Sequence, residues 1–85
     1  MPYIKQERRA RLGTAMEYSA IDTIDTAGEL NYLITIFVKD YLGDNPNYER
    51  FNSVIGALEA AKLELYRRMV APYEDKKIAE NGDVY

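Results

Sequence analysis

The chain lacks several residue types on which common enzyme chemistry depends. It has 85 residues and contains no cysteine, no histidine and no tryptophan. Histidine is the usual general base near neutral pH, and cysteine and histidine are the usual ligands of zinc. The two serines, Ser19 and Ser53, have no obvious base beside them in a nucleophile-elbow context. The sequence therefore predicts a protein that is not an enzyme, with no catalytic residues, no metal site and no cofactor.

Long apolar runs and disulfides are also missing. No stretch approaches the roughly 20 apolar residues of a membrane span, and the start MPYIKQERR has no apolar segment of the kind that signal peptides carry. A single domain of this size buries only roughly 60% of its unfolded surface, and no disulfide can support it. We therefore expect one soluble cytoplasmic domain over residues 1–85 that has no membrane contact and assembles as a homo-oligomer.

Charge is distributed unevenly along the chain. Residues 1–11 carry four basic residues against one acidic residue, a net charge of +3, whereas residues 12–66 carry nine acidic residues against three basic ones, a net charge of −6. The whole chain has a net charge of −3, and a general nucleic-acid binder would be basic, so nucleic acid is not expected as a partner. The basic N-terminus either binds a small anion or docks on an acidic helix or subunit, and charge alone leaves both open.

Two segments show the periodicity of amphipathic helices. Thr26 followed by Glu29 is the pattern of a capping box, and Gly43 is a helix terminator. Between them apolar residues recur at steps of three and four: Leu30, Leu33, Ile34, Phe37, Val38 and Tyr41. The pattern predicts a helix over about 27–42 with this stripe buried.

A second helix is predicted after a short loop. Asn45, Pro46 and Asn47 are typical of a helix start with proline in its first turn, and Pro72 should stop the helix near Val70. Its expected buried stripe consists of Phe51, Val54, Ile55, Leu58, Leu65 and Met69. The sequence thus predicts an all-α fold built on an antiparallel helical hairpin, about 27–42 and 46–70.

Short helices are expected on both sides of the hairpin. Residues 2–12 could form one that ends at Gly13, and residues 14–24 another, which would cover the hairpin with Met16, Tyr18, Ile21 and Ile24. Residues 73–80 predict one or two C-terminal turns that end at Asn81 and Gly82.

Tyrosine supplies eight of the ten aromatic residues, and basic side chains accompany it in two places. The first cluster is Tyr3 with Lys5, Arg8 and Arg9, and the second is Tyr66, Arg67 and Arg68 followed by Tyr73. Rings beside guanidinium groups can stack a nucleobase and hold its phosphates. Because the same groups also serve protein interfaces, these eight candidate ligand-binding residues fit either use.

Four segments carry a resemblance to a known family: MPYIKQERR, GELNYLIT, GALEAAKLELYRRMVAPYEDKK and ENGDVY. They resemble a family of short proteins from phages and bacteria that is described only as a domain of unknown function. The resemblance spans most of the chain and is weakest over residues 14–24. It implies no catalytic residue, and a phage setting implies a compact counter-defence protein that acts by binding in the cytoplasm of the host cell.

Two hypotheses of function follow. The first is a non-enzymatic protein that sequesters a small anionic, nucleotide-like ligand in an oligomer, with arginines on the phosphates and tyrosines on the base. The alternative is a protein–protein interaction module that inhibits or scaffolds a host or phage protein through its tyrosine-rich surface. An enzyme ranks third.

Overall fold

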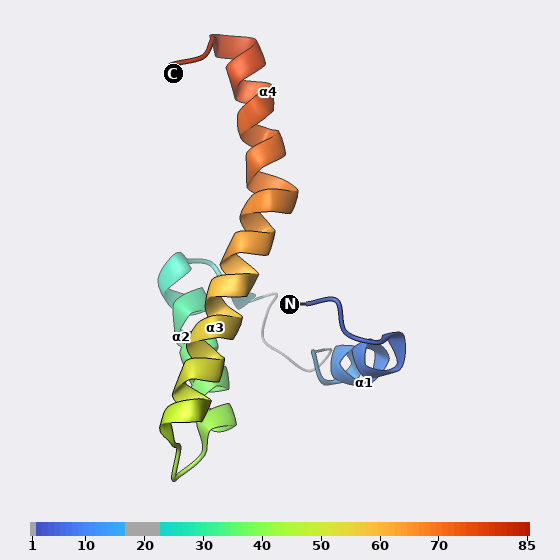
Figure 1. Cartoon of the computed structure of the whole chain (residues 1–85), viewed down its shortest axis with the longest axis vertical. Coiled ribbons are helices and arrows are strands. Elements are labelled where there is room, and N and C mark those ends of the chain that lie inside the picture. Colours follow the sequence, from blue (N-terminus) through green and yellow to red (C-terminus); the bar gives the residue numbers. More distant parts are fainter. Residues whose placement is uncertain (1, 17–22) are drawn as a thin grey trace. The chain divides into compact units, whose positions relative to one another are not determined.

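The regular structure of the chain is helical. The computed structural model describes residues 2–16 and 23–85, and no strand occurs within these ranges. The elements, in chain order, are α1 (Gln6–Met16), α2 (Ala27–Leu42), α3 (Tyr48–Leu65), the π-helical turn η2 (Tyr66–Val70) and α4 (Ala71–Asn81) (Figure 1). The predicted all-α fold is confirmed.

Contacts divide the chain into two compact units. One unit spans Tyr3–Val54 and holds α1, α2 and the first turns of α3. The other spans Ile55–Tyr85, with Pro2, and holds the rest of α3, η2, α4 and the C-terminal tail. Each unit is described by itself below.

Helix α2 begins and ends as predicted. The Glu29 N–H donates to the Thr26 side-chain oxygen at 3.1 Å, and Glu29 Oε1 accepts from the Thr26 N–H at 2.9 Å, which completes the capping box. The helix ends at Gly43, whose φ of 73° and ψ of −164° lie in a region that essentially only glycine adopts. The Gly43 N–H donates to the Lys39 carbonyl at 3.1 Å, so the terminal turn is closed.

Helix α3 begins later than predicted. Asn47 is the cap, because its Oδ1 accepts from the Arg50 N–H at 2.9 Å, and the helix starts at Tyr48. The prediction that Pro46 lies in the first turn is therefore wrong. Proline disfavours helical geometry at the residue before it, here Asn45, so the chain enters the helix only after Pro46.

One side chain connects the end of α2 to the start of α3. Arg50 Nη2 donates to the Tyr41 carbonyl at 2.6 Å, and the Arg50 Cζ lies 4.4 Å from the centroid of the Tyr41 ring. The Tyr41 carbonyl is among the last four of α2, which have no donor inside the helix. Arg50 therefore supplies a missing hydrogen bond and a cation–π contact across the loop.

The predicted helix stop at Pro72 is wrong. The backbone stays helical at Val70 (φ −78°, ψ −47°) and Ala71 (φ −59°, ψ −47°), and the Ala71 N–H donates to the Tyr66 carbonyl five residues earlier. Proline has no N–H and crowds the carbonyl four residues before it. The wider π-turn relieves that crowding, so the ribbon runs on through α4 (Figure 1).

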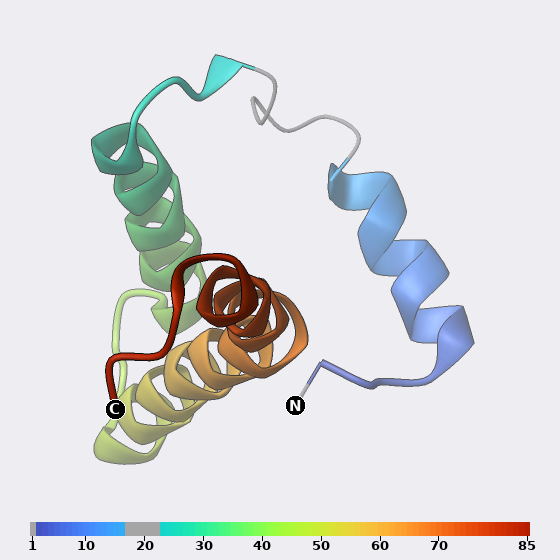
Figure 2. The same ribbon diagram turned by 90° about the horizontal axis from the view of Figure 1, so that it is seen from above.

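The end of α4 agrees with the prediction, and the N-terminal helix does not. Gly82, with a φ of 91°, ends α4 after Asn81, and the tail leaves the helix there (Figure 2). Helix α1 passes through Gly13 and reaches Met16, because a glycine with helical φ is tolerated inside a helix. Most of the helix expected over 14–24, with Tyr18 and Ile21, lies outside the described residues.

The two apolar stripes are mostly exposed. In the part of the chain that the structure describes, Val54 is the one buried residue, at 9% exposure. Leu33 and Val38 are half-buried. The other members of the two stripes are between 40% and 66% exposed: Leu30, Ile34, Phe37, Tyr41, Phe51, Ile55, Leu58, Leu65 and Met69. The prediction that both stripes are buried is therefore wrong for a single chain, which does not supply enough facing surface.

The capping box predicts a specific response to acid. Hydrogen bonds from the Asp25 N–H, then from the hydroxyl and N–H of Thr26, hold the pKa of Glu29 below its ordinary value of 4.5. The ionised Glu29 carboxylate therefore stabilises the folded helix fully above pH 4.5. This contribution is lost as the pH falls through the lower pKa that Glu29 has in the folded state. We expect helicity, followed by circular dichroism, to fall over that range in the wild type and to fall less in Glu29→Gln.

A matched control lies on the same helix. Asp40→Asn makes the same change of charge at a position with no role in the capping box, and its acid response should follow that of the wild type. An equal change in both variants would contradict the role assigned to Glu29.

Candidate functional site

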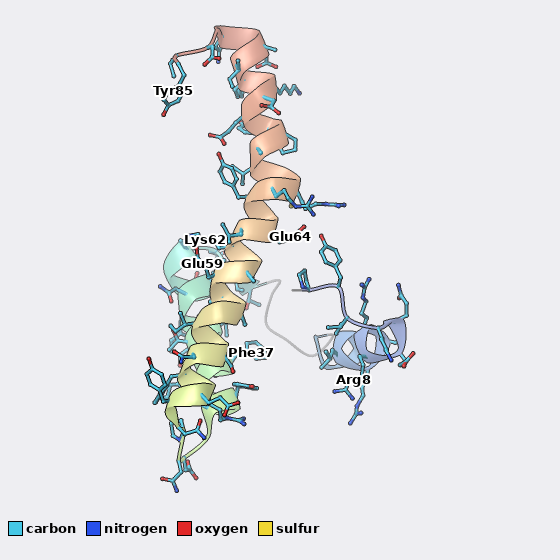
Figure 3. The ribbon with its side chains drawn as sticks, viewed as in Figure 1. Arg8, Phe37, Glu59, Lys62, Glu64 and Tyr85 are labelled. Carbon is cyan, nitrogen blue, oxygen red and sulfur yellow. The ribbon has the colours of Figure 1, made fainter. Side chains whose placement is uncertain are left out.

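The N-terminal cluster lies on one short segment. Tyr3 and Lys5 precede α1, and Arg8 and Arg9 lie in its first turn, where both of their N–H groups donate to the Lys5 carbonyl. Arg9 Nε donates to the Ile4 carbonyl at 2.7 Å, which turns its guanidinium back onto the segment. The Arg8 side chain projects from α1 (Figure 3). The structure thus brings these four residues together locally, on an exposed surface.

The C-terminal cluster already has partners within its own helix. The Tyr66 hydroxyl donates to Glu74 Oε1, and Arg67 Nη2 lies 2.5 Å from Glu64 Oε1. The Tyr73 ring lies 5.6 Å from Lys77 Nζ. Two of the predicted ligand groups, the Tyr66 hydroxyl and the Arg67 guanidinium, are therefore engaged by carboxylates.

Helix geometry separates the members of this cluster. Residues one or two apart do not share a helix face, so Tyr66, Arg67 and Arg68 point in different directions. Tyr66 and Tyr73 are seven residues apart, but the π-turn between them changes the α-helical spacing, so the two rings do not share a face. The sequestration hypothesis needs an arginine and a tyrosine on the same ligand. Tyr66 and Arg68 do not lie side by side on the η2 turn, so within one chain these two residues do not meet that need.

Large apolar side chains are exposed along the helix before, within and after the π-turn. We call them the Leu–Tyr stripe, and its six members are 42% to 66% exposed: Ile55, Leu58, Leu65, Tyr66, Met69 and Tyr73. The unit that contains them has one continuous helix and a short tail. Within the described part of that unit no second helix is available to cover these side chains.

Ion pairs occur along the same helix. Lys62 Nζ lies 3.2 Å from Glu59 Oε1, one turn away on α3 (Figure 3). On α4, Lys77 Nζ lies 3.3 Å from Glu80 Oε2. The spacing of three and four residues predicts helix-surface ion pairs of Glu59 with Lys62 and of Glu64 with Arg67 and Arg68. The Glu59–Lys62 and Glu64–Arg67 pairs are present, and no carboxylate partner of Arg68 is found among the described residues. The partner of Tyr66, Glu74, was not predicted, because the expected break at Pro72 separated the two residues.

Two surface hollows in the described part of the chain lie away from the predicted clusters. One of about 290 Å³ is lined by Glu74, Lys77, Ile78 and residues 81–85, and one of about 150 Å³ by Thr23, Ile24, Glu29, Tyr32 and Leu33. Neither includes a predicted ligand-binding residue. In the described ranges, no three histidine, cysteine, aspartate or glutamate side chains gather in a metal-binding group, and no helix has the length and apolar content to cross a bilayer.

The comparisons with known proteins identify the family. A family model described as "Domain of unknown function (DUF6899)" matches residues 1–84. The chain belongs to the DUF6899 family. The match confirms the resemblance to a family of unknown function, and it does not bear on phage origin. No curated protein and no solved structure matches the chain.

The Tyr66–Glu74 hydrogen bond generates a prediction about α4. It spans Pro72, where one backbone donor is missing, so Tyr66→Phe should weaken the amide protection of residues 73–81 in hydrogen exchange. Tyr73→Phe is the matched control, since no hydrogen bond of its hydroxyl is found among the described residues. Equal protection in the two variants would contradict this role.

The Tyr66–Glu74 hydrogen bond should also be lost at high pH. Hydrogen bonding to Glu74, followed by the charge of that carboxylate, raises the pKa of Tyr66 above its ordinary value of 10.0. The bond therefore contributes below pH 10 and is lost as the pH rises through the raised pKa. In the wild type, protection of residues 73–81 should fall over that range.

Proposed function

We propose that this DUF6899 chain is a non-enzymatic helical interaction module that works as a homo-oligomer in the cytoplasm. One observation carries the proposal: the Leu–Tyr stripe lies on a helix whose own unit has nothing to cover it. Its partners in function would be a second copy of the chain and a host or phage protein.

The physical argument starts from the cost of leaving the stripe in water. Full burial of one large apolar side chain stabilises a protein by about 1.5–3 kcal/mol, and the stripe has six such side chains at about half exposure. A chain of 85 residues without disulfides is marginal alone. A shared interface supplies the missing burial, and tyrosine and methionine are enriched in such interfaces.

The predicted hairpin belongs to this proposal. The apolar stripes of α2 and α3 have the spacing of helices that pack along each other, and Arg50 holds the connected ends together through Tyr41. We propose that α2 packs antiparallel against the first turns of α3, through Phe51 and the buried Val54, and leaves the Leu–Tyr stripe available. The interaction module then presents the remaining tyrosines to its partner.

A second candidate function has its own supporting observation. Among the described residues, the guanidinium groups of Arg8 and Arg68 have no carboxylate partner. Tyr3, Lys5 and Arg9 lie on the same segment as Arg8. A nucleotide-like anion could bind at Arg8 or at Arg68 in an oligomer, with a tyrosine ring on its base, which is the sequestration hypothesis.

The oligomer is tested by placing a charge on the stripe. Met69 is 66% exposed, so Met69→Glu should leave a monomer folded, whereas in an oligomer it buries an unpaired charge. We expect the wild type to be an oligomer by native mass spectrometry and Met69→Glu to be a helical monomer. Ala79→Glu, at an exposed position on α4 six residues after Tyr73 and therefore off its face, is the control and should remain oligomeric. A monomeric wild type would overturn the proposal.

Sequestration is tested on the same instrument. Protein purified gently from cells should carry a few hundred extra daltons of ultraviolet-absorbing material that denaturation releases. Arg8→Ala and Arg68→Ala should lose it while keeping the helicity of the wild type. An oligomer without any adduct favours the interaction module over sequestration.

A further inference from the structure

We propose that the basic N-terminal segment of one copy, residues 3–12, packs on an exposed apolar face of α2 in a second copy. The face consists of Leu30, Ile34 and Phe37, and we call it the α2 face. The inference rests on the proposed homo-oligomer. It adds a contact inside that oligomer between two parts of the chain that the Leu–Tyr stripe does not include.

The α2 face is continuous and open. Leu30, Ile34 and Phe37 follow one another at steps of four and three residues on an uninterrupted α-helix, so they lie within about 60° of one another around its axis. They are 49%, 40% and 59% exposed, although α1 and the first turns of α3 belong to the same unit. The described part of the chain therefore leaves this face uncovered.

A different side of α2 is available for the hairpin. Val38 and Leu42 are half-buried and lie about 80° and 120° around the helix from Leu30, so the proposed packing on α3 belongs to that side. Tyr41 follows Phe37 on the apolar stripe of α2, but Arg50 already lies against its ring. A helix with apolar side chains on several sides is typical of one that is covered on several sides. The α2 face therefore needs a partner other than α3.

Charge makes the N-terminal segment of another copy a suitable occupant. Residues 1–11 have a net charge of +3, and residues 25–44 carry four acidic residues against one basic residue, a net charge of −3. Glu29 and Asp40 are eleven residues apart, so both lie on one side of the α2 face, about 80° to 100° around the helix from Leu30. An acidic edge beside an apolar face favours a basic partner.

The N-terminal segment has the matching chemistry. Arg8 and Leu12 are one turn apart on α1, so the exposed Leu12 side chain has a guanidinium group on the same side of the helix. Tyr3 and Ile4 are also exposed, at 49% and 41%. An arginine can lay its aliphatic stem on an apolar surface and direct its charged end to a carboxylate. Leu12 and Arg8 can thus occupy the α2 face and its acidic edge together.

The two surfaces do not satisfy each other within one chain. Among the described residues, no ion pair of Arg8 or Asp40 is found. Both surfaces belong to the unit that spans Tyr3–Val54, and both stay exposed there. Complementary surfaces that remain open within a chain can meet between copies, as they do when subunits exchange an element.

The contact is too small to hold two copies together by itself. Three large side chains do not bury the roughly 1,200 Å² of a stable interface. The contact therefore forms inside the oligomer, where the effective concentration of the partner segment is high. Met69→Glu, which lacks the oligomer, is still expected to be monomeric.

The test uses introduced cysteines, because the chain has none of its own. A full-length chain with Leu12→Cys is coexpressed with a tagged chain that carries Leu30→Cys, Ile34→Cys or Phe37→Cys. A disulfide needs Cα atoms within about 7 Å, and the three positions sample roughly 10 Å along α2, so the test does not depend on one register. After mild oxidation of the purified oligomer, mass spectrometry should show a mixed disulfide at one or more of these positions.

Tyr32→Cys is the matched control. Tyr32 is 66% exposed and lies on the far side of α2, about 160° around the helix from Leu30. Its mixed disulfide with Leu12→Cys should be about tenfold less abundant than the best of the three on the α2 face. Circular dichroism should show the wild-type helix content in every variant.

The charges are tested in the same cross-linking experiment. Arg8→Glu in the chain with Leu12→Cys, and separately Asp40→Lys in the tagged chain, should each lower the yield of mixed disulfide about twofold to fivefold, as expected for exposed charge pairs. At 1 M salt, where the Debye length is about 3 Å, this loss should disappear. An unchanged yield at low salt in both variants overturns the choice of a basic occupant.

Other results overturn the inference in different ways. If the mixed sample gives no disulfide and the double variant L12C/I34C gives an internal one, α1 covers the α2 face of its own chain. If disulfides form only between two chains with Phe37→Cys, α2 pairs with α2. An oligomeric wild type without a mixed disulfide at any position leaves the homo-oligomer standing, whereas a monomeric wild type overturns both proposals.

Discussion

The hydrogen bond from the Ala71 N–H to the Tyr66 carbonyl is the interaction on which the C-terminal half of the molecule depends. It closes the π-turn that carries the helix past Pro72, a residue that would otherwise break it. With the bond in place, residues 55–81 form one continuous helix. The Tyr66–Glu74 hydrogen bond then supports the same turn from the side.

Contacts within its own unit do little to stabilise this helix, because no described residue of that unit is buried. Burial of the exposed Leu–Tyr stripe against another surface would stabilise it. The two hollows described above also lie away from both tyrosine–arginine clusters. The exposed stripe is therefore the feature on which the proposed interaction module rests.

Local rules predicted the parts of the fold that local chemistry determines. The capping box at Thr26, the glycine ends at Gly43 and Gly82, and the three-residue ion pairs each involve neighbours on one turn, so the sequence was sufficient. Pro72 and Gly13 were misjudged because their effect depends on whether the helix around them can adjust. The candidate site was harder still, because the direction of each side chain in 66–70 depends on a π-turn that no spacing rule predicts.

The π-turn also changes the direction of the side chains that follow it. Its hydrogen-bonded ring contains one residue more than the ring of an α-helix. The side chains after Val70 therefore point about 100° away from the direction that an uninterrupted α-helix would give them. Deleting one residue from 66–70 would convert the π-turn into an ordinary α-helical turn and leave the later side chains pointing as they do now. A residue added to or removed from the α-helical parts on either side has no such local outlet and rotates everything beyond it.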